Sequence, residues 1–466
     1  MSISITFLGA ADTVTGSRAL ISTPTVKILV DCGLFQGLRE LRRRNWDPFP
    51  VDPSTIDAVV LTHAHLDHCG YLPLLAKRGF DGKIFATQYT VELAQVILRD
   101  SAHLQVEDAK YAAKKGYSKH VNPAPLYDLD DAEKSFRLFD VTPFHARTEI
   151  APHCFVTFSP SGHILGSSTV LLEIEGKRFL FTGDLGRPGH PLLVDPELPP
   201  MERCDVIVTE STYGDRIHET PPEEFANEIN AAIKRGGSIL IPAFAVDRTE
   251  VILMALRELI TAGTIPRIPI YVDSPMALTA LNFYRAAVRD NSVEIRDGVS
   301  ERWASQDPFD PGSLMQASTT EESKALNDIS ETSIIISASG MATGGRVVHH
   351  LEHMLPDPKN TVILVGYQAV GSRGRDLADG KPEIKMHGQL IPVSAHVAQV
   401  ESFSVHADSD ELIAWLRQAP APGIAFVNHG ESAGQESMQK RLASELQWSA
   451  EIPAPLKEFV LPESEK

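Results

Sequence analysis

The sequence contains few cysteines and no long hydrophobic run. Only 4 of its 466 residues are cysteines, and no two of them have the CxxC spacing: Cys32, Cys69, Cys154 and Cys204. A chain of this length buries a core without disulfides, so we predict reduced, mostly buried thiols. No apolar stretch approaches the roughly 20 residues of a membrane span, and the first residues resemble strands rather than a signal peptide. The sequence therefore predicts a cytoplasmic protein with no membrane partner.

Positive charge is also scarce. The chain has 61 acidic and 43 basic residues, which leaves a formal net charge of −18 at pH 7. Such a field repels a polyanion at long range and argues against a protein that coats nucleic acid non-specifically. Contact with nucleic acid must then come from a local cationic groove or from bound metal ions. With 43% hydrophobic and 22% charged residues, the chain is an ordinary globular one, long enough for two or three domains.

Two patterns of predicted elements divide the chain. Short strand-like runs dominate the first part, from Ile3–Leu8 to Val206–Thr209, and short strands return near the C-terminus. Between them strands and helices alternate, for example strand Ser238–Ile241 and helix Arg248–Ile260. This order is typical of a doubly wound parallel sheet. The middle part therefore indicates an inserted domain, with residues 290–328 as its irregular excursion.

The densest chemistry lies in a short block after the apolar run Ala58–Leu61. His63, His65, Asp67 and His68 offer imidazoles and a carboxylate within a few residues. Most of these groups would lack partners in a core, but they can converge on a cation. Imidazole and carboxylate are ligands that zinc accepts at about 2.0–2.2 Å. The alternative, a solvated histidine-rich turn, explains this density of ligand groups less well.

Further strand ends carry single groups of the same kind. His163 and Asp184 each follow a predicted strand, beside glycines that let the backbone approach closely. Asp31 follows the strand Lys27–Val30. Its position is better suited to orienting a histidine ligand, through the other ring nitrogen, than to binding a metal directly.

With these residues in view, the sequence resembles a known family. The block His63–His68, together with Asp31, His163 and Asp184, is similar to the motifs of the metallo-β-lactamase superfamily. Later motifs resemble those of its β-CASP branch: Thr209–Thr212, Phe403–Asp408 and Asn428–Glu431. That branch contains the endonuclease that processes the 3′ ends of eukaryotic messenger RNA and related bacterial and archaeal ribonucleases.

The resemblance implies the fold class and the domain organisation. We expect an α/β protein made of a metallo-β-lactamase αββα sandwich with an inserted α/β β-CASP domain. The sandwich would comprise residues 1–213 and 401–466, and the β-CASP domain residues 214–400. Departures from the family pattern, at Val405 and Asn428, remove no functional group.

The resemblance also implies two zinc ions and their ligands. One ion would take His63, His65 and His163, the other Asp67, His68 and His429, and Asp184 would bridge them. Two zinc ions about 3.5–4 Å apart lower the pKa of a shared water, so a bridging hydroxide would be the nucleophile. The resemblance also places Asp67 among the catalytic residues. Asp31 would orient a ligand.

A general acid is expected as well, because the leaving 3′-oxygen needs a proton. The family pattern nominates His406, with Glu210 hydrogen-bonded to it and orienting it. His396 follows Ser394 and Ala395 and so resembles the acid motif by letters, but it lacks the acidic residue that Asp408 supplies after His406. We interpret His396 as a strand residue.

The inserted domain must help to hold the substrate, given the acidity of the chain. The turn Ser337–Arg346 is rich in glycine and hydroxyl groups, which is how backbone N–H groups at a helix N-terminus are offered to a phosphate. Arginines are expected to add cations to the same edge. The candidate phosphate-binding residues are Ser339, Gly340, Thr343, Gly344, Arg346, Arg248 and Arg373.

These features predict a zinc-dependent ribonuclease that hydrolyses phosphodiester bonds of single-stranded RNA, in RNA processing or decay. Cleavage within the RNA and cleavage from an end both fit the pattern, as do a monomer and a homodimer. Three alternatives stay open. A DNA nuclease of the same branch is disfavoured by His429, since such relatives generally lack a histidine there. A non-catalytic β-CASP scaffold subunit would be expected to have lost ligands, and none is missing. A hydrolase of thioesters or lactams would have no use for a β-CASP domain.

Overall fold

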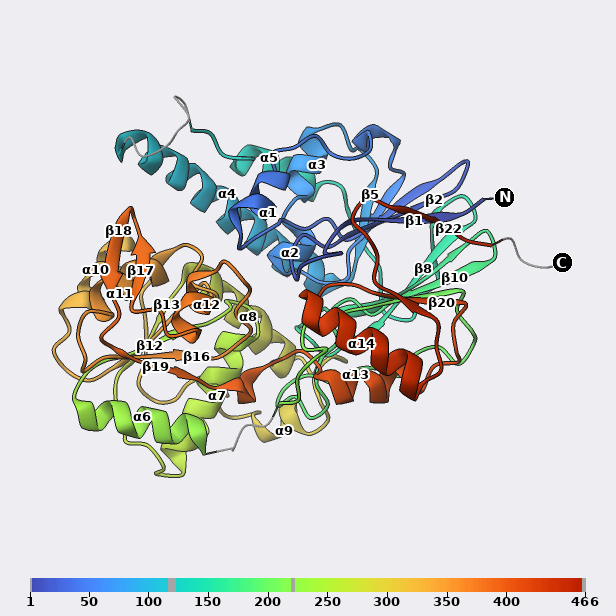
Figure 1. Ribbon diagram of the computed structural model, residues 1–466. Coiled ribbons are helices and arrows are strands. Elements are labelled where there is room, and N and C mark those ends of the chain that lie inside the picture. Colours follow the sequence, from blue (N-terminus) through green and yellow to red (C-terminus); the bar gives the residue numbers. More distant parts are fainter. Residues whose placement is uncertain (1, 116–122, 219–222, 463–466) are drawn as a thin grey trace. The chain divides into compact units, whose positions relative to one another are not determined.

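The computed structural model describes residues 2–115, 123–218 and 223–462 (Figure 1). The chain forms two compact units: unit 1 comprises residues 1–217 and 406–466, and unit 2 comprises residues 218–405. The sequence-based division falls after residues 213 and 400. Among the described residues, no helix combines the length and apolar character of a membrane span.

Unit 1 contains two sheets that pack face to face. The first is 7-stranded, in the order β22 (Glu458–Val460), β1 (Ser4–Gly9), β2 (Arg18–Ser22), β3 (Lys27–Val30), β4 (Ala58–Val60), β5 (Lys83–Ala86) and β6 (Phe139–Val141). The second is also 7-stranded, in the order β21 (Ala450–Glu451), β20 (Ile424–Val427), β11 (Val206–Thr209), β10 (Lys177–Phe181), β9 (Ser168–Ile174), β8 (Cys154–Pro160) and β7 (Thr148–Ala151).

Alternation of apolar side chains explains how the two sheets join. In β8 the burial pattern alternates along the strand, so that Cys154, Val156 and Phe158 face the partner sheet. They enter one hydrophobic cluster with Phe7 of the first sheet and Phe426 of the second. This shared core holds the sandwich together.

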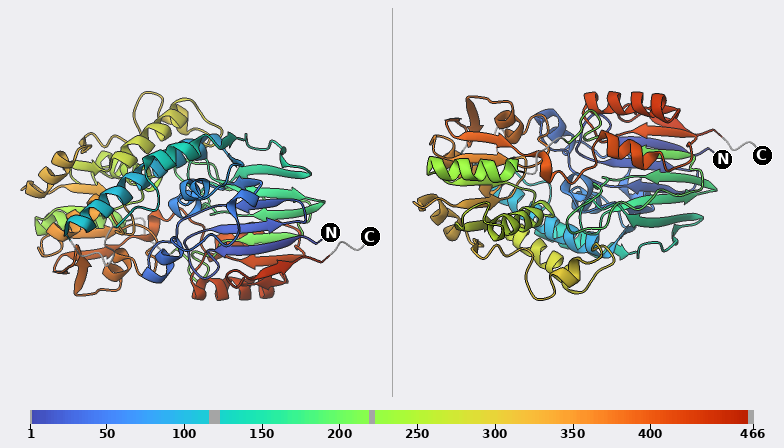
Figure 2. Two further views of the ribbon diagram at one scale, coloured as in Figure 1. Left: turned by 90° about the horizontal axis from the view of Figure 1, so that it is seen from above. Right: turned by 90° about the horizontal axis from the view of Figure 1, so that it is seen from below.

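Helices cover both outer faces of the sandwich. One layer contains α3 (Leu72–Lys77), α4 (Gln88–Lys115) and α5 (Leu129–Phe136). The other contains α13 (Ser409–Leu416) and α14 (Ser432–Glu445), which share a hydrophobic cluster with β10, β11 and β20. Figure 2 shows α4 in the view from above and α13 and α14 in the view from below. Unit 1 is thus the expected αββα sandwich.

Unit 2 is built on a parallel sheet. Its 6 strands run in the order β14 (Leu314–Gln316), β13 (Ile270–Asp273), β15 (Ile334–Ser337), β12 (Ile239–Pro242), β16 (Thr361–Leu364) and β19 (His396–Gln399). Its longer helices are α6 (Glu224–Arg235), α7 (Arg248–Thr261), α8 (Pro275–Arg289) and α11 (Arg346–Met354). Figure 1 shows α6 and α11 on opposite faces of this sheet. A helix on each face is the doubly wound arrangement that the sequence predicts.

One expectation needs correction in unit 2. Residues 290–328 are more regular than predicted, because they contain α9 (Val299–Arg302), α10 (Thr320–Ala325), the turn η2 (Leu326–Asp328) and the edge strand β14. β14 is short and largely exposed, so it gives no alternating signal. Near the end of unit 2, β17 (Glu383–Met386) and β18 (Gln389–Pro392) form a hairpin and β19 joins the parallel sheet. The cysteines are all free and buried, as predicted.

Candidate metal centre

The strands of unit 1 bring the predicted ligands to one edge of the sandwich. β3 and β4 are parallel neighbours in the first sheet, and β10, β11 and β20 are parallel neighbours in the second. In parallel strands the carboxyl ends lie together, so the residues that follow them are neighbours. The residues at these ends are Asp31, His63, Asp184, Glu210 and His429.

The loop after β4 is held by the segment after β3. Cys32 donates its backbone N–H to the carbonyl of His68 at 2.7 Å. A Cβ at Gly33 would meet the backbone oxygen of Asp67 at 1.6 Å, so only glycine permits this approach. The short helix α2 (Leu66–Cys69) begins after His65 and contains both Asp67 and His68. These contacts hold the segment His63–His68 in place.

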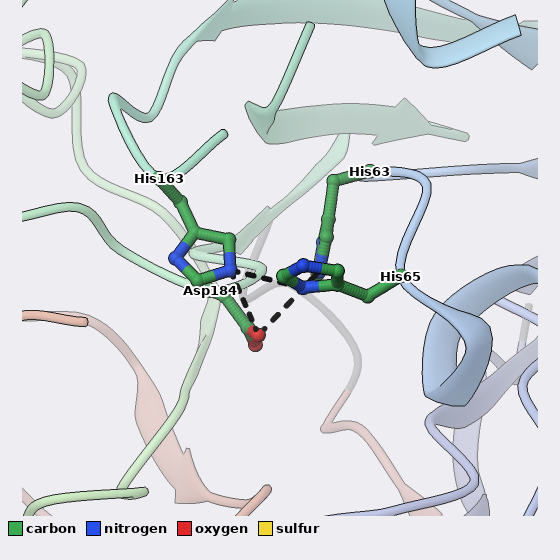
Figure 3. Close-up of side chains that lie close together, drawn as sticks. All are labelled: His63, His65, His163 and Asp184. Atoms are coloured by element: carbon green, nitrogen blue, oxygen red, sulfur yellow. Dashed lines mark hydrogen bonds and ion pairs between the residues drawn. The ribbon is translucent and has the colours of Figure 1, made fainter. Parts of the chain in front are cut away.

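One group of ligand atoms comprises His63, His65, His163 and Asp184 (Figure 3). His65 Nδ1 lies 3.1 Å from His63 Nε2 and 3.2 Å from His163 Nε2. Asp184 Oδ2 lies 3.5 Å from the Nε2 atom of both His63 and His163. Figure 3 shows the four side chains pointing toward one another.

A second group comprises Asp67, His68 and His429. His68 Nε2 lies 3.1 Å from His429 Nε2, and Asp67 Oδ2 lies 3.5 Å from the same atom of His429. The other oxygen of Asp184, Oδ1, lies 3.3 Å from His68 Nε2 and 3.6 Å from His429 Nδ1. Asp184 thus turns one oxygen to each group.

These contacts fit bound cations better than hydrogen bonds. Two ligands on a tetrahedral ion with bonds of 2.0–2.1 Å lie about 3.3–3.4 Å apart, close to the spacings seen here. His65 Nδ1 faces two imidazole nitrogens, although one ring nitrogen makes a single hydrogen bond. Asp184 Oδ1 is buried and has no hydrogen-bond partner among the described residues. An anionic oxygen placed in this way is suited to a metal ion.

Burial and neighbouring charges set the protonation of the cluster. Burial lowers the pKa of His65 to about 4 and lowers that of His63 as well, so both rings are neutral and able to bind a metal near pH 7. Burial alone would raise the pKa of Asp184, but His429, His68 and His63 together hold it well below its usual range. Asp184 is therefore an anion.

Asp31 supports the second group from behind. Its Oδ2 accepts a hydrogen bond from His68 Nδ1 at 2.7 Å, and its Oδ1 accepts one from the backbone N–H of Thr62 at 2.9 Å. With Nδ1 donating to Asp31, His68 presents Nε2 to the metal centre. Burial alone would lower the pKa of His68, but Asp184 and Asp31 together hold it well above its usual range.

His406 and Glu210 lie beside the same cluster. His406 Nδ1 is 3.2 Å from Glu210 Oε2 and 3.9 Å from Asp184 Oδ2. Glu210 is fixed in turn, because its Oε1 accepts the backbone N–H of Leu185 at 2.6 Å. The His406 side chain is 15% exposed, whereas that of Glu210 is only 1% exposed. The histidine is the member of this pair that solvent reaches.

The candidate phosphate residues belong to unit 2, and most of them lie in the turn between β15 and α11. Ser339 Oγ accepts the backbone N–H of Thr343 at 3.1 Å. Arg373 donates to the carbonyls of Ala342 and Thr343 at 3.1 and 2.9 Å. Gly340 and Gly344 lie in the same turn, between Ser339 and Arg346. The Ser339 hydroxyl and the Arg373 guanidinium group therefore stabilise the backbone of this turn.

The other two predicted arginines, like Arg373, have internal partners. Arg346 pairs at 2.6 Å with Asp273, whose side chain is fully buried. Arg248 is buried and donates to the carbonyl of Val365. The Arg248 guanidinium thus satisfies a strand-end carbonyl inside unit 2, and its contact with a phosphate stays a prediction. His396 lies on β19 of unit 2 and pairs with Glu228 at 3.0 Å.

Sequence reasoning missed an exposed cationic patch in unit 1. The short helix α1 (Arg39–Arg44) buries none of its residues, and Arg39, Arg42 and Arg43 form no ion pair with any described residue. Trp46, just after this helix, is 55% exposed. The run Arg42–Arg44 close to Trp46 was the sequence feature that could have indicated this patch. We call Arg39, Arg42, Arg43 and Trp46 the α1 patch.

An αββα sandwich that gathers histidine and aspartate ligands at its strand ends defines a metal-dependent hydrolase of the metallo-β-lactamase type. Family models agree: the metallo-beta-lactamase superfamily matches residues 16–234, the Beta-Casp domain residues 249–377, and the Zn-dependent metallo-hydrolase RNA specificity domain residues 390–453. The chain belongs to the β-CASP family of metallo-β-lactamases.

Named relatives match along most of the chain. Ribonuclease TTHA0252 of Thermus thermophilus is 37% identical, over 93% of this chain and 95% of its own length. The RNase J-like protein of Methanocaldococcus jannaschii is 31% identical, over 91% of this chain and 92% of its own. Transcription termination factor FttA of the same archaeon is 32% identical, over 92% of this chain and 67% of its own. A protein of unknown function from Enterococcus faecalis V583 shares the fold, with 12% identity and a TM-score of 0.51 over 99% of this chain and 100% of that one.

Proposed function

We propose that the protein hydrolyses phosphodiester bonds of single-stranded RNA with two zinc ions bound at the candidate metal centre. The observation that carries this proposal is the placement of Asp184, whose Oδ2 faces His63 and His163 and whose Oδ1 faces His68 and His429. One carboxylate shared between two ligand groups is an arrangement for two adjacent ions. RNA as the substrate is supported by the match to an RNA specificity domain and by relatives that are named ribonucleases.

The chain's own residues define how the two ions would be held. His63, His65 and His163 would bind one ion, Asp67, His68 and His429 the other, and Asp184 both. When bound, the ions lower the pKa of water to near neutrality and stabilise negative charge on phosphodiester oxygens. Asp31 fixes the orientation of His68, so that Nε2 and not Nδ1 serves as the ligand atom.

His406 would supply the proton that the leaving 3′-oxygen needs. Its Nδ1 is held by Glu210, which leaves Nε2 as the nitrogen to face a leaving group. Glu210 is a positioning residue, since it acts on the substrate only through His406. No nucleophilic side chain is required in this scheme, because the attacking oxygen comes from water.

The α1 patch offers a first surface for the RNA strand. Arg44, at the end of the same helix, pairs with Asp12 at 3.0 Å, and Ala10 accepts the backbone N–H of His429 at 2.8 Å. The patch is therefore connected through the loop after β1 to a ligand of the metal centre. Sites for single-stranded nucleic acid usually combine arginines that contact phosphates with an exposed aromatic side chain, such as tryptophan, on which a base stacks.

The test is cleavage of single-stranded RNA labelled at the 5′ or the 3′ end, with and without a chelator, beside single-stranded DNA of matched sequence. The proposal predicts cleavage of RNA that the chelator abolishes and that added Zn²⁺ restores. The two labels also separate internal cleavage from cleavage at an end. Preferred cleavage of DNA, or RNA cleavage that survives the chelator, would contradict the proposal.

A further inference from the structure

A second cluster of metal-binding side chains lies in unit 2. His349 and Glu352 stand one turn apart on α11, and His387 stands in the turn of the hairpin β17–β18. One ligand atom from each residue lies within 4.8 Å of the other two. Imidazole and carboxylate groups from separate elements thus converge at one point of unit 2, in residues that the proposed hydrolysis does not use.

His387 contacts both other members of the cluster. His387 Nδ1 lies 3.0 Å from Glu352 Oε2, and the rings of His349 and His387 stack with centroids 4.6 Å apart. The histidine–carboxylate contact in the second ligand group, between His429 Nε2 and Asp67 Oδ2, measures 3.5 Å. His349 is exposed, so its ring can turn about its side-chain bonds to complete the coordination at little cost.

The backbone holds the two sides of the cluster in place. The hairpin pairs Met386 with Gln389, which leaves His387 and Gly388 as a two-residue turn with positive φ angles of 46° and 87°. Behind the turn, Ile384 and Met386 share a hydrophobic cluster with Leu351 of α11. Helix and hairpin are therefore packed together before any ion binds, and Figure 1 shows them side by side.

We propose that His349, Glu352 and His387 bind a third divalent transition-metal ion, which ties the hairpin β17–β18 to α11. Two imidazoles and one carboxylate select Zn²⁺, Co²⁺, Ni²⁺ or Cu²⁺ over Mg²⁺ and Ca²⁺, because the hard ions prefer all-oxygen sites. Three protein ligands leave one tetrahedral position for water.

The ion would strengthen a connection to the glycine-rich turn. Arg373 donates to the carbonyl of Lys385 in β17 as well as to those of Ala342 and Thr343 in the turn. α11 itself begins at Arg346, the last residue of that turn. An ion between the hairpin and α11 would therefore link two elements that both contact the candidate phosphate turn. Its binding should stabilise unit 2.

The experiment measures bound metal and thermal stability in the full chain. Equilibrium dialysis against micromolar free Zn²⁺ is followed by metal analysis, for the wild type and for His349→Ala and His387→Asn. Asparagine accepts a positive φ, so His387→Asn keeps the hairpin turn while removing the imidazole. The matched control is His353→Ala, which removes an exposed histidine from the same helix.

We expect both variants to hold one zinc ion fewer per chain than the wild type and the control. The same difference should persist in an Asp184→Asn background, which separates this site from the candidate metal centre. Added Zn²⁺ should raise the melting temperature of the Asp184→Asn chain, and the rise should be smaller once His387→Asn is added. Equal metal content in the wild type and His387→Asn, or zinc bound only at millimolar concentration, would overturn the proposal.

Discussion

Asp31 Oδ2 accepts a hydrogen bond from His68 Nδ1 at 2.7 Å, although Asp31 is not itself a ligand in the proposed centre. The bond is buried, and it decides which ring nitrogen of His68 faces the ligand cluster. A carboxylate that orients a histidine ligand also makes the ligand more basic. In the proposed centre, Asp31 would therefore support a ligand while lying outside the ligand set.

Replacing Asp31 with Asn should lower metal affinity about 10–100-fold, the usual effect of losing such an orienting partner. The cause is loss of the negative charge that holds the His68 ring. The measurement is zinc retained after dialysis against a weak chelator. The matched control, Asp290→Asn, removes an exposed carboxylate from unit 2 and should retain wild-type zinc. Full zinc retention in Asp31→Asn would refute this role.

Replacing Asp184 with Asn should reduce the occupancy of both ions together. Each oxygen of Asp184 faces a different ligand group, so one substitution weakens two sites. Metal analysis and RNA cleavage should both fall sharply. His396→Ala, whose side chain pairs with Glu228 in unit 2, should leave both near wild type. Loss of only one ion from Asp184→Asn would show that the carboxylate does not bridge.

Replacing His406 with Ala should retain zinc and RNA binding but slow cleavage by a factor of about 10²–10⁴, the usual contribution of general acid catalysis. RNA with sulfur in place of the scissile 3′-oxygen has a leaving group that needs no proton, so its cleavage should be much less sensitive. If both substrates slow equally, His406 acts on binding or structure instead.

Glu210→Gln should show the same substrate dependence as His406→Ala, with a smaller loss. The amide still contacts His406 Nδ1 but no longer supplies a negative charge beside it. Cleavage rates of the natural and the sulfur-containing RNA give the comparison. A variant that loses both activities equally would indicate that Glu210 only supports the backbone at Leu185, whose N–H it accepts.

The double substitution Arg42→Glu with Arg43→Glu should weaken binding of single-stranded RNA and flatten its salt dependence. Each phosphate contact on a single strand contributes a slope of about 0.7 in the logarithmic plot of affinity against salt. The measurement is RNA affinity at several salt concentrations in a chain kept inactive by His406→Ala. The control, Arg289→Glu, alters an exposed arginine that already pairs with Asp290. An unchanged slope would exclude the α1 patch from the RNA path.

The sequence was most informative where ligands follow short apolar runs. His63, Asp184 and His429 each stand just after a buried strand of the sandwich, so strand prediction and chemistry pointed to the same places. The αββα class came from the resemblance rather than from periodicity, because several strands are too short to show alternation. β4 illustrates this limit, with only three residues, all of them buried.

Arginines were the least predictable part of the site. Arg346 ends the candidate phosphate turn and Arg248 opens α7, yet they contact Asp273 and the carbonyl of Val365 inside unit 2. A guanidinium group serves a buried carbonyl or carboxylate as readily as a phosphate, and only the three-dimensional contacts decide between them. The cluster of His349, Glu352 and His387 was hidden for a similar reason, because His387 reaches α11 from a distant hairpin.

The most direct test of the binuclear account is a zinc titration of metal-free protein with labelled single-stranded RNA as the substrate. The His349→Ala variant is used, so that the third proposed ion does not complicate the stoichiometry. The account predicts that cleavage appears only as the second equivalent of zinc binds, because Asp184 must hold both ions. Full activity after one equivalent, or cleavage before any zinc is added, would contradict it.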